Sequence, residues 1–211
     1  YYENYVVPNL ASFHIAGAIT PEAAIGALES INNRWEPKEV SFPTLPAPDM
    51  PDEPQIYFYD VPGAKQSVLS FGYPALAATD LDYYPAHLMN YRLGGGGFAS
   101  ILTQELREGK GYTYGIRSGF SGSTLPGPFQ ISSAVRSNIT MEAVSLIKYI
   151  LEAYPKEYDQ EDLEVTKGYM LKSNARQFET LGSKLSMLRN ISNYDWPYDY
   201  IKKQEAMVRQ I

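Results

Sequence analysis

The 211-residue sequence contains no cysteine and only two histidines, His14 and His87. The absence of cysteine excludes disulfide bonds and thiolate metal sites, and it fits a reducing or an oxidising compartment equally. Neither histidine has a second histidine four residues away, the spacing that places two imidazoles on one helix face. Two isolated imidazoles cannot form a closed or a catalytic zinc site. We therefore expect both histidines to be structural and no metal to be bound within these 211 residues.

Long apolar runs and an excess of positive charge are also missing. No apolar run reaches the ~20 residues that span a bilayer, so the sequence predicts no membrane span. The net charge of −6, from 18 basic and 24 acidic side chains, argues against nucleic acid as a partner. The sequence has no initiator methionine and begins in mid-pattern with YYENYVVP, so we expect a segment of a longer polypeptide.

The hydrophobic pattern predicts strands that come in pairs between helical stretches, rather than strict alternation of strands and helices. This order favours an α+β fold with a mostly antiparallel sheet that helices cover on one face. The predicted strands are 11–19, 55–61, 66–75, 112–122 and 128–136. The predicted helices are 21–32, 81–93, 98–108, a helix capped by Thr140, 159–178, 181–192 and 197–210.

We expect one domain over residues 1–211, since the length suits a single large domain. In it, residues 1–40 would hold an entry strand and helix, and residues 55–211 the main sheet and its helices. Residues 41–54 between them contain five prolines and predict an extended connector, too short to mark a domain boundary. A ligand for proline-reading modules is the less favoured interpretation of this connector.

The stretch 93–120 organises the rest of the chain. Four consecutive glycines, Gly94 to Gly97, precede a helical pattern that stops at Gly109-Lys110-Gly111, and a strand follows. The glycines lack the ending of a phosphate-binding loop, so they favour a tight turn where backbones approach closely. Arg107 in the last helical turn and Tyr114 early in the strand bracket the junction. Together they could donate two hydrogen bonds to a carbonyl oxygen as it gains negative charge.

Each of these two residues also has a purely structural interpretation. Arg107 could favour the helix dipole and pair with Glu108 or Glu105. Strand alternation places Tyr114 on the same side as Ile116, the side expected to face the core. From the residues alone, a packed tyrosine is the favoured interpretation of Tyr114.

The string LGGGGFASILTQELREGKGYTYG resembles the second-domain signature of the M16 zinc peptidases, the pitrilysin-like or inverzincin family. That signature reads LGGG-x-x-S-x-L-x-x-x-L-R-E-x-x-G-L-x-Y, and Tyr112 replaces its usual leucine. The family's Arg and Tyr, the R/Y pair, lie seven positions apart, and here 114 − 107 = 7. Matches to two further family phrases extend the resemblance, namely Tyr5, Pro8, Asn9, Gly17, Ile19, and then Gln66, Ser67, Gly72 and Pro74.

The resemblance implies a non-zinc domain that lines a peptide chamber, with Arg107 and Tyr114 as its catalytic residues. The family's zinc ligands, an H-x-x-E-H helix, are missing here, so zinc would be held by a partner domain of the same chain or by another subunit. A peptide would be the substrate, and the isolated segment would be inactive. The resemblance leaves the compartment open between a bacterial envelope and the cytoplasm.

Two other functions remain open at this point. One is a non-catalytic relative of the M16 peptidases, a scaffold or peptide-holding subunit. The other is a plain peptide-binding module that uses an exposed sheet edge.

Overall fold

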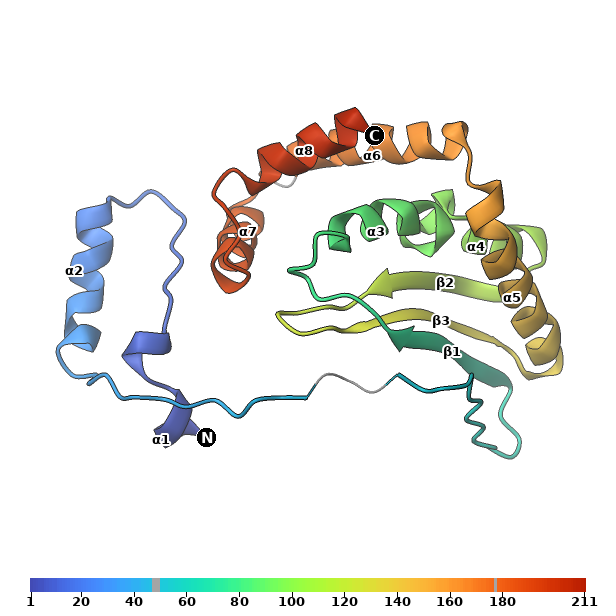
Figure 1. Ribbon diagram of the computed structural model, residues 1–211, viewed down its shortest axis with the longest axis horizontal. Coiled ribbons are helices and arrows are strands. Elements are labelled where there is room, and N and C mark those ends of the chain that lie inside the picture. The colour runs from blue at the N-terminus through green and yellow to red at the C-terminus, as the bar shows by residue number, and fades with distance from the viewer. Residues whose placement is uncertain (47–49, 177) are drawn as a thin grey trace. The chain divides into compact units, whose positions relative to one another are not determined.

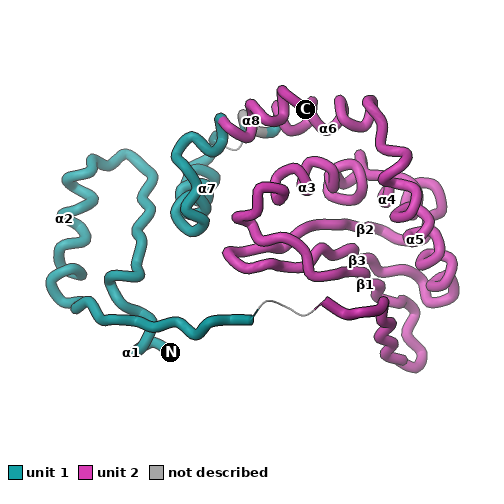
Figure 2. Tube along the Cα trace, in the orientation of Figure 1, with its two compact units in different colours: residues 1–46, 173–202 teal, residues 47–172, 203–211 magenta. Residues whose placement is uncertain are grey.

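The computed structural model describes residues 1–46, 50–176 and 178–211. The chain divides into two compact units, residues 1–46 with 173–202 and residues 47–172 with 203–211 (Figure 2). One domain over residues 1–211 stays a prediction. The predicted connector 41–54 has no helix or strand where it is described, and its residues 47–49 lie outside the described part of the chain.

The second unit is built on a three-stranded antiparallel sheet in the order β1-β3-β2 (Figure 1). Its strands are β1 (Gln66–Pro74), β2 (Thr113–Phe120) and β3 (Pro128–Arg136). In β3, alternate residues face the core, and these buried residues are Phe129, Ile131, Ser133 and Val135. The predicted β2–β3 hairpin is therefore confirmed, with Phe120 paired to Phe129 next to the loop.

Helices cover one face of this sheet, as the α+β prediction requires. The helical elements of the second unit are α3 (Tyr83–Asn90), η2 (Tyr91–Gly95), η3 (Gly97–Ala99), α4 (Ile101–Thr103), η4 (Gln104–Gly109), η5 (Ser137–Ile139) and α5 (Thr140–Glu157). Leu102 and Leu106 are fully buried against Ile116 and Ile131 of the sheet, and Ile147 of α5 joins the same cluster. Burial of such side chains contributes ~1.5–3 kcal/mol each, so this layer stabilises the packing of the helices on the sheet.

The first unit contains α1 (Tyr2–Tyr5), η1 (Pro8–Leu10), α2 (Pro21–Asn32) and α7 (Leu181–Asn193). Thr20 caps α2 by accepting a hydrogen bond from the backbone N–H of Ala23 at 3.3 Å, and Pro21 is the first helical residue, as predicted. Two further helices run from one unit into the other along the chain, α6 (Gln160–Arg176) and α8 (Tyr200–Gln210). The predicted helix 159–178 ends at Arg176, and residue 177 lies outside the described part.

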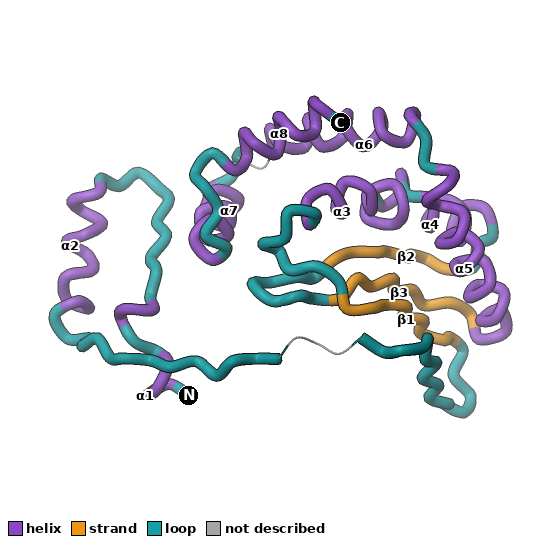
Figure 3. The backbone as a smooth tube through the Cα atoms, viewed as in Figure 1, coloured by secondary structure: helices purple, strands orange, loops and turns teal. Residues whose placement is uncertain are grey.

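Several local predictions are wrong. Neither 11–19 nor 55–61 forms a strand (Figure 3). The Pro62-Gly63 turn does form, with the Ala64 N–H donating to Val61 O at 3.1 Å, but the residues before it find no ladder partner. A strand needs a second strand as hydrogen-bond partner, and an alternating apolar pattern does not reveal whether such a partner exists. The pattern alone therefore predicted two strands that do not form. Thr140 is the first residue of α5 rather than its cap, since its hydroxyl donates to Ser137 O at 2.9 Å.

The glycine run provides the close approach that the sequence predicted. Gly94 lies in η2 directly against β2, and a Cβ built on it would meet Ser118 Oγ, with Ser118 N at 2.8 Å and Leu102 Cδ1 at 2.9 Å. Gly97 adopts a φ of +58°, a left-handed conformation that favours glycine. The run therefore lets the chain pass closely over the sheet and turn into α4.

Strand β2 contains a bulge between Thr113 and Ile116. Three residue steps on β2 (116 − 113 = 3) face two on β3, from Val135 to Ser133 (135 − 133 = 2). The extra residue lets both Thr113 and Ile116 face the core, while Tyr114 turns to the opposite side and is 90% exposed. The packed-tyrosine interpretation is therefore wrong, because it assumed uninterrupted alternation along the strand.

Buried hydroxyl groups hold this bulge in place. The Thr113 Oγ1 accepts a hydrogen bond from the Gly115 N–H at 3.0 Å and donates to Ala134 O at 2.8 Å. The hydroxyl of Ser133 donates to Gly115 O at 3.0 Å. The polar groups that the bulge removes from the ladder are thus satisfied by side chains from both strands.

Thr113→Val tests this arrangement. The substitution keeps the shape of the side chain but leaves the Gly115 N–H and Ala134 C=O without their buried partner, so the free energy of unfolding should fall by about 1–3 kcal/mol. Thr124→Val, at an exposed position in the β2–β3 loop, is the matched control and should change it by less than about 0.5 kcal/mol. Urea titrations of the two variants measure the difference, and equal effects would refute the role of Thr113.

Gly94→Ala should destabilise the protein by about 1–3 kcal/mol, because the added methyl group overlaps backbone and side-chain atoms of Ser118. Gly168→Ala in α6 is the control, since a Cβ there meets nothing within 4 Å. It should leave stability unchanged or raise it by up to about 1 kcal/mol through helix propensity. Thermal unfolding gives the melting temperature of each variant. Changes of the same sign and size in Gly94→Ala and Gly168→Ala would contradict the close approach of Gly94 to Ser118.

His87 gives a pH prediction. Its ring centroid lies 4.6 Å from that of Tyr83 and 5.5 Å from that of Phe120, and burial lowers the pKa of its imidazole. In the unfolded state the imidazole has its ordinary pKa of about 6.5, so below that pH the unfolded state binds more protons than the folded state. The free energy of unfolding is therefore at its full value above pH 6.5 and decreases as the pH falls. His87→Gln should reduce this loss between pH 7 and 5. Urea unfolding at each pH gives the free energy of unfolding. If this free energy changed with pH equally in the wild type and in His87→Gln, the prediction would be contradicted.

Candidate functional site

A pocket of about 420 Å³ opens where helix η4, the start of β2 and the end of β3 meet. Both sequence-predicted site residues, Arg107 and Tyr114, line it. Its full lining is Gln66, Arg107, Glu108, Gly111, Tyr112, Thr113, Tyr114, Ala134 and Arg136. The two residues that the sequence singled out therefore lie at one pocket of the second unit.

Arg107 reaches this pocket through the widened turn of η4. The Lys110 N–H donates to Glu105 O at 3.0 Å, a bond that spans one residue more than an α-helical turn. Leu106 is fully buried beneath the turn, so the neighbouring Arg107 projects outward. Gly111 then takes a φ of +61°, which lets the chain reverse directly into β2.

The guanidinium of Arg107 has two contacts. Its Nε lies 3.3 Å from Glu108 Oε1, and its central carbon lies 4.5 Å from the centroid of the Phe98 ring. The predicted pairing with Glu108 is thus present, but the Arg107 side chain is 37% exposed, and pairs in such surroundings contribute little to stability. Within the described part of the chain, its two terminal nitrogens have no hydrogen-bond acceptor. These nitrogens could therefore donate to a ligand.

Tyr114, at the other side of the junction between η4 and β2, is exposed. The bulge in β2 turns its side chain away from the core, and no residue in the described ranges hydrogen-bonds to its hydroxyl. Tyr112, two positions earlier, is only half-buried and lines the same pocket. A phenol that is both exposed and unpaired can donate a hydrogen bond to an incoming group.

Sequence reasoning missed two polar side chains of this pocket, Gln66 and Arg136. They form a cross-strand pair, since Gln66 at the start of β1 faces Arg136 at the end of β3. Their signal was present in the pattern of β3, where Arg136 follows the buried Val135 and so faces the opposite side. Only the register between the strands adds Gln66 and brings both residues to η4.

The described residues offer no set of side chains that would suit a zinc ion. His14 and His87 belong to different compact units, and His87 packs against two aromatic rings. Across residues 1–46, 50–176 and 178–211, no group of three or more His, Cys, Asp or Glu side chains could hold a metal ion. In the same ranges, none of the helices is sufficiently long and apolar to cross a membrane.

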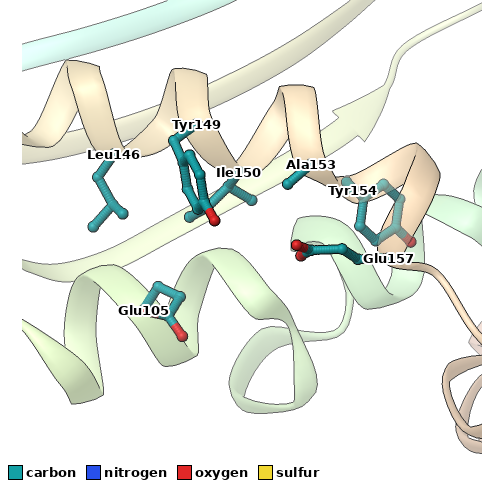
Figure 4. A pocket seen from close by; sticks show the side chains of 7 residues that line it. All are labelled: Glu105, Leu146, Tyr149, Ile150, Ala153, Tyr154 and Glu157. Carbon is teal, nitrogen blue, oxygen red and sulfur yellow. The ribbon is translucent and has the colours of Figure 1, made fainter.

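A second pocket, of about 260 Å³, lies between η4 and α5 (Figure 4). Glu105 contributes to it from η4, and the other lining residues come from α5, among them Glu157 and Tyr149. The Tyr154 hydroxyl on its rim already donates to Met89 O at 2.5 Å. This pocket has carboxylates but no cationic side chain, so it does not suit a carbonyl oxygen that gains negative charge.

The family model described as the peptidase M16 inactive domain matches residues 1–169 of the chain. No curated protein matches the sequence.

Solved structures share the fold. The crystal structure of a peptidase M16 inactive domain from Pseudomonas fluorescens is 24% identical, with a TM-score of 0.78, and the match covers 92% of this chain and 46% of that one. A protease from Helicobacter pylori is 18% identical, with a TM-score of 0.59, over 71% of this chain and 39% of that one. A protein from Bordetella pertussis Tohama I, described as a "putative zinc protease", is 19% identical, with a TM-score of 0.55, over 69% and 80%.

The chain spans about half the length of the Pseudomonas fluorescens protein, so it corresponds to one part of that relative. At identities below 25%, these structures establish the α+β fold with its antiparallel sheet and helical layer. The sequence family is established by the match over residues 1–169. The chain belongs to the family of peptidase M16 inactive domains.

Proposed function

We propose that this chain is the zinc-free domain of an M16-type metallopeptidase, and that Arg107 and Tyr114 bind the carbonyl oxygen of a peptide substrate. The observation that supports this most directly is that both side chains line one pocket, although they come from different elements. The descriptions of two relatives as proteases point to peptides as the substrate class.

The chemistry of the two donors suits this role. The terminal nitrogens of Arg107 carry positive charge, and the Tyr114 hydroxyl adds a neutral donor. Donors that already point at the carbonyl oxygen before the reaction need not move when negative charge develops on it, and so they stabilise that charge. Leu106 beneath the η4 turn and the bulge in β2 hold the backbone from which the two side chains extend toward the pocket.

Zinc would be held by another domain of the full protein or by another subunit, as the description of one relative as a "putative zinc protease" suggests. When bound there, it would supply Lewis-acid chemistry. This chain's residues would bind the peptide and orient its carbonyl group. The isolated 211-residue chain should therefore bind peptide but not cleave it.

A peptide-holding relative without activity is the second candidate. The outer edge of β1 supports it, because within the described residues β1 pairs with β3 alone. A strand edge with unpaired backbone groups can accept an extended peptide by strand addition.

Arg107→Ala and Tyr114→Phe in the full-length protein test the first candidate. Each substitution removes one donor to the developing charge, so each should lower the turnover number by roughly 10²–10³-fold. Both side chains are at least partly exposed, so the unfolding midpoint should stay the same. Steady-state cleavage of a panel of peptides gives the turnover number.

Arg189→Ala on α7 and Tyr198→Phe are the matched controls, since both residues are exposed and lie outside the pocket. They should leave turnover unchanged. Wild-type turnover in both Arg107→Ala and Tyr114→Phe would remove the catalytic proposal. A full-length protein that binds peptides without cleaving them would favour the peptide-holding candidate instead.

A further inference from the structure

We propose that Arg136 is a specificity-determining residue that binds a carboxylate group of the peptide beside the carbonyl held by Arg107 and Tyr114. This inference rests on the proposed function and adds the substrate class: peptides that present an acidic side chain or a free C-terminal carboxylate at this pocket.

Arg136 is the last residue of β3 and lines the same pocket as Arg107. Its backbone is well fixed. The preceding residue, Val135, is buried in the core, and the following residue, Ser137, donates from its N–H to Lys65 O at 3.1 Å and from its hydroxyl to Ala64 O at 2.7 Å. The guanidinium thus extends from a backbone held on both sides, so only its side chain has to be ordered when a ligand binds.

The charges of the pocket do not cancel. It contains two guanidinium groups, those of Arg107 and Arg136, and one carboxylate, Glu108, so its formal charge is 2 − 1 = +1. Glu108 pairs with Arg107 through Nε, and Arg136 forms no ion pair with any described residue. This local excess of positive charge stands out on a chain whose net charge is −6.

A peptide carbonyl oxygen requires hydrogen-bond donors but no second full positive charge. A guanidinium without an anionic partner is best satisfied by a carboxylate, which it can grip through two parallel hydrogen bonds. The amide of Gln66, paired across the strands with Arg136, offers a further donor at the same place. The pocket therefore combines a pair of donors for the carbonyl group with a separate cation for a carboxylate.

Binding of fluorescent peptides to the full-length protein tests this inference. The peptides share one sequence, carry Glu, Gln or Lys at one position, and end in a free or an amidated C-terminus. Fluorescence anisotropy with a metal chelator present measures the dissociation constant without turnover. The variants are Arg136→Gln, which removes the charge, and Arg136→Lys, which keeps it without the planar fork. Arg209→Gln, at an exposed position of α8, is the control.

The wild-type protein should bind a carboxylate-bearing peptide at least ~10-fold more tightly than its neutral counterpart, the usual effect of a charge-assisted hydrogen bond. Arg136→Gln should abolish this preference, Arg136→Lys should keep part of it, and Arg209→Gln should keep all of it. If replacing Glu by Gln removes the preference, the group recognised is a side chain. If amidation removes it, the group is the C-terminus.

Equal affinity of the wild-type protein for acidic and neutral peptides would overturn the role of Arg136 and leave the proposed function standing. An equal loss of affinity for all peptides in Arg136→Gln would overturn it too, because a structural role has that effect. No binding of any peptide would overturn both proposals. Loss of turnover for every peptide in Arg107→Ala, with the carboxylate preference intact, would separate the two roles.

Discussion

The bulge between Thr113 and Ile116 is the constraint on which the candidate site depends. A regular strand would point Tyr114 into the same layer as Ile116, where its hydroxyl would be buried. One extra residue, satisfied by the hydroxyls of Thr113 and Ser133, turns the phenol outward while the core contacts on both sides are kept. The widened turn of η4 places Arg107 at the same pocket, so two departures from regular geometry meet there.

Much of the fold could be predicted from the sequence, because its cues are local. Thr20-Pro21 starts α2, and the alternation along β3 marks its buried face. The glycine run predicted a close backbone approach, which Gly94 makes against Ser118. The likeness of 93–120 to the M16 signature led to the family that the match over residues 1–169 establishes.

What could not be predicted depends on partners distant in the sequence. Residues 11–19 and 55–61 have apolar patterns, but a strand exists only where a second strand completes its hydrogen bonds. Alternation assigned Tyr114 to the core, because a bulge is set by the register against β3 rather than by residues 112–120 themselves. Arg136 joined the site only when pairing placed Gln66 and the end of β3 beside η4.

The central claim is that Arg107 and Tyr114 act on one and the same atom of a peptide. A crystal structure of the full-length protein with a non-hydrolysable peptide analogue tests it most directly. We expect a terminal nitrogen of Arg107 and the hydroxyl of Tyr114 within about 3 Å of a single carbonyl oxygen or its analogue. A peptide bound elsewhere, or one that contacts only one of the two side chains, would contradict the account.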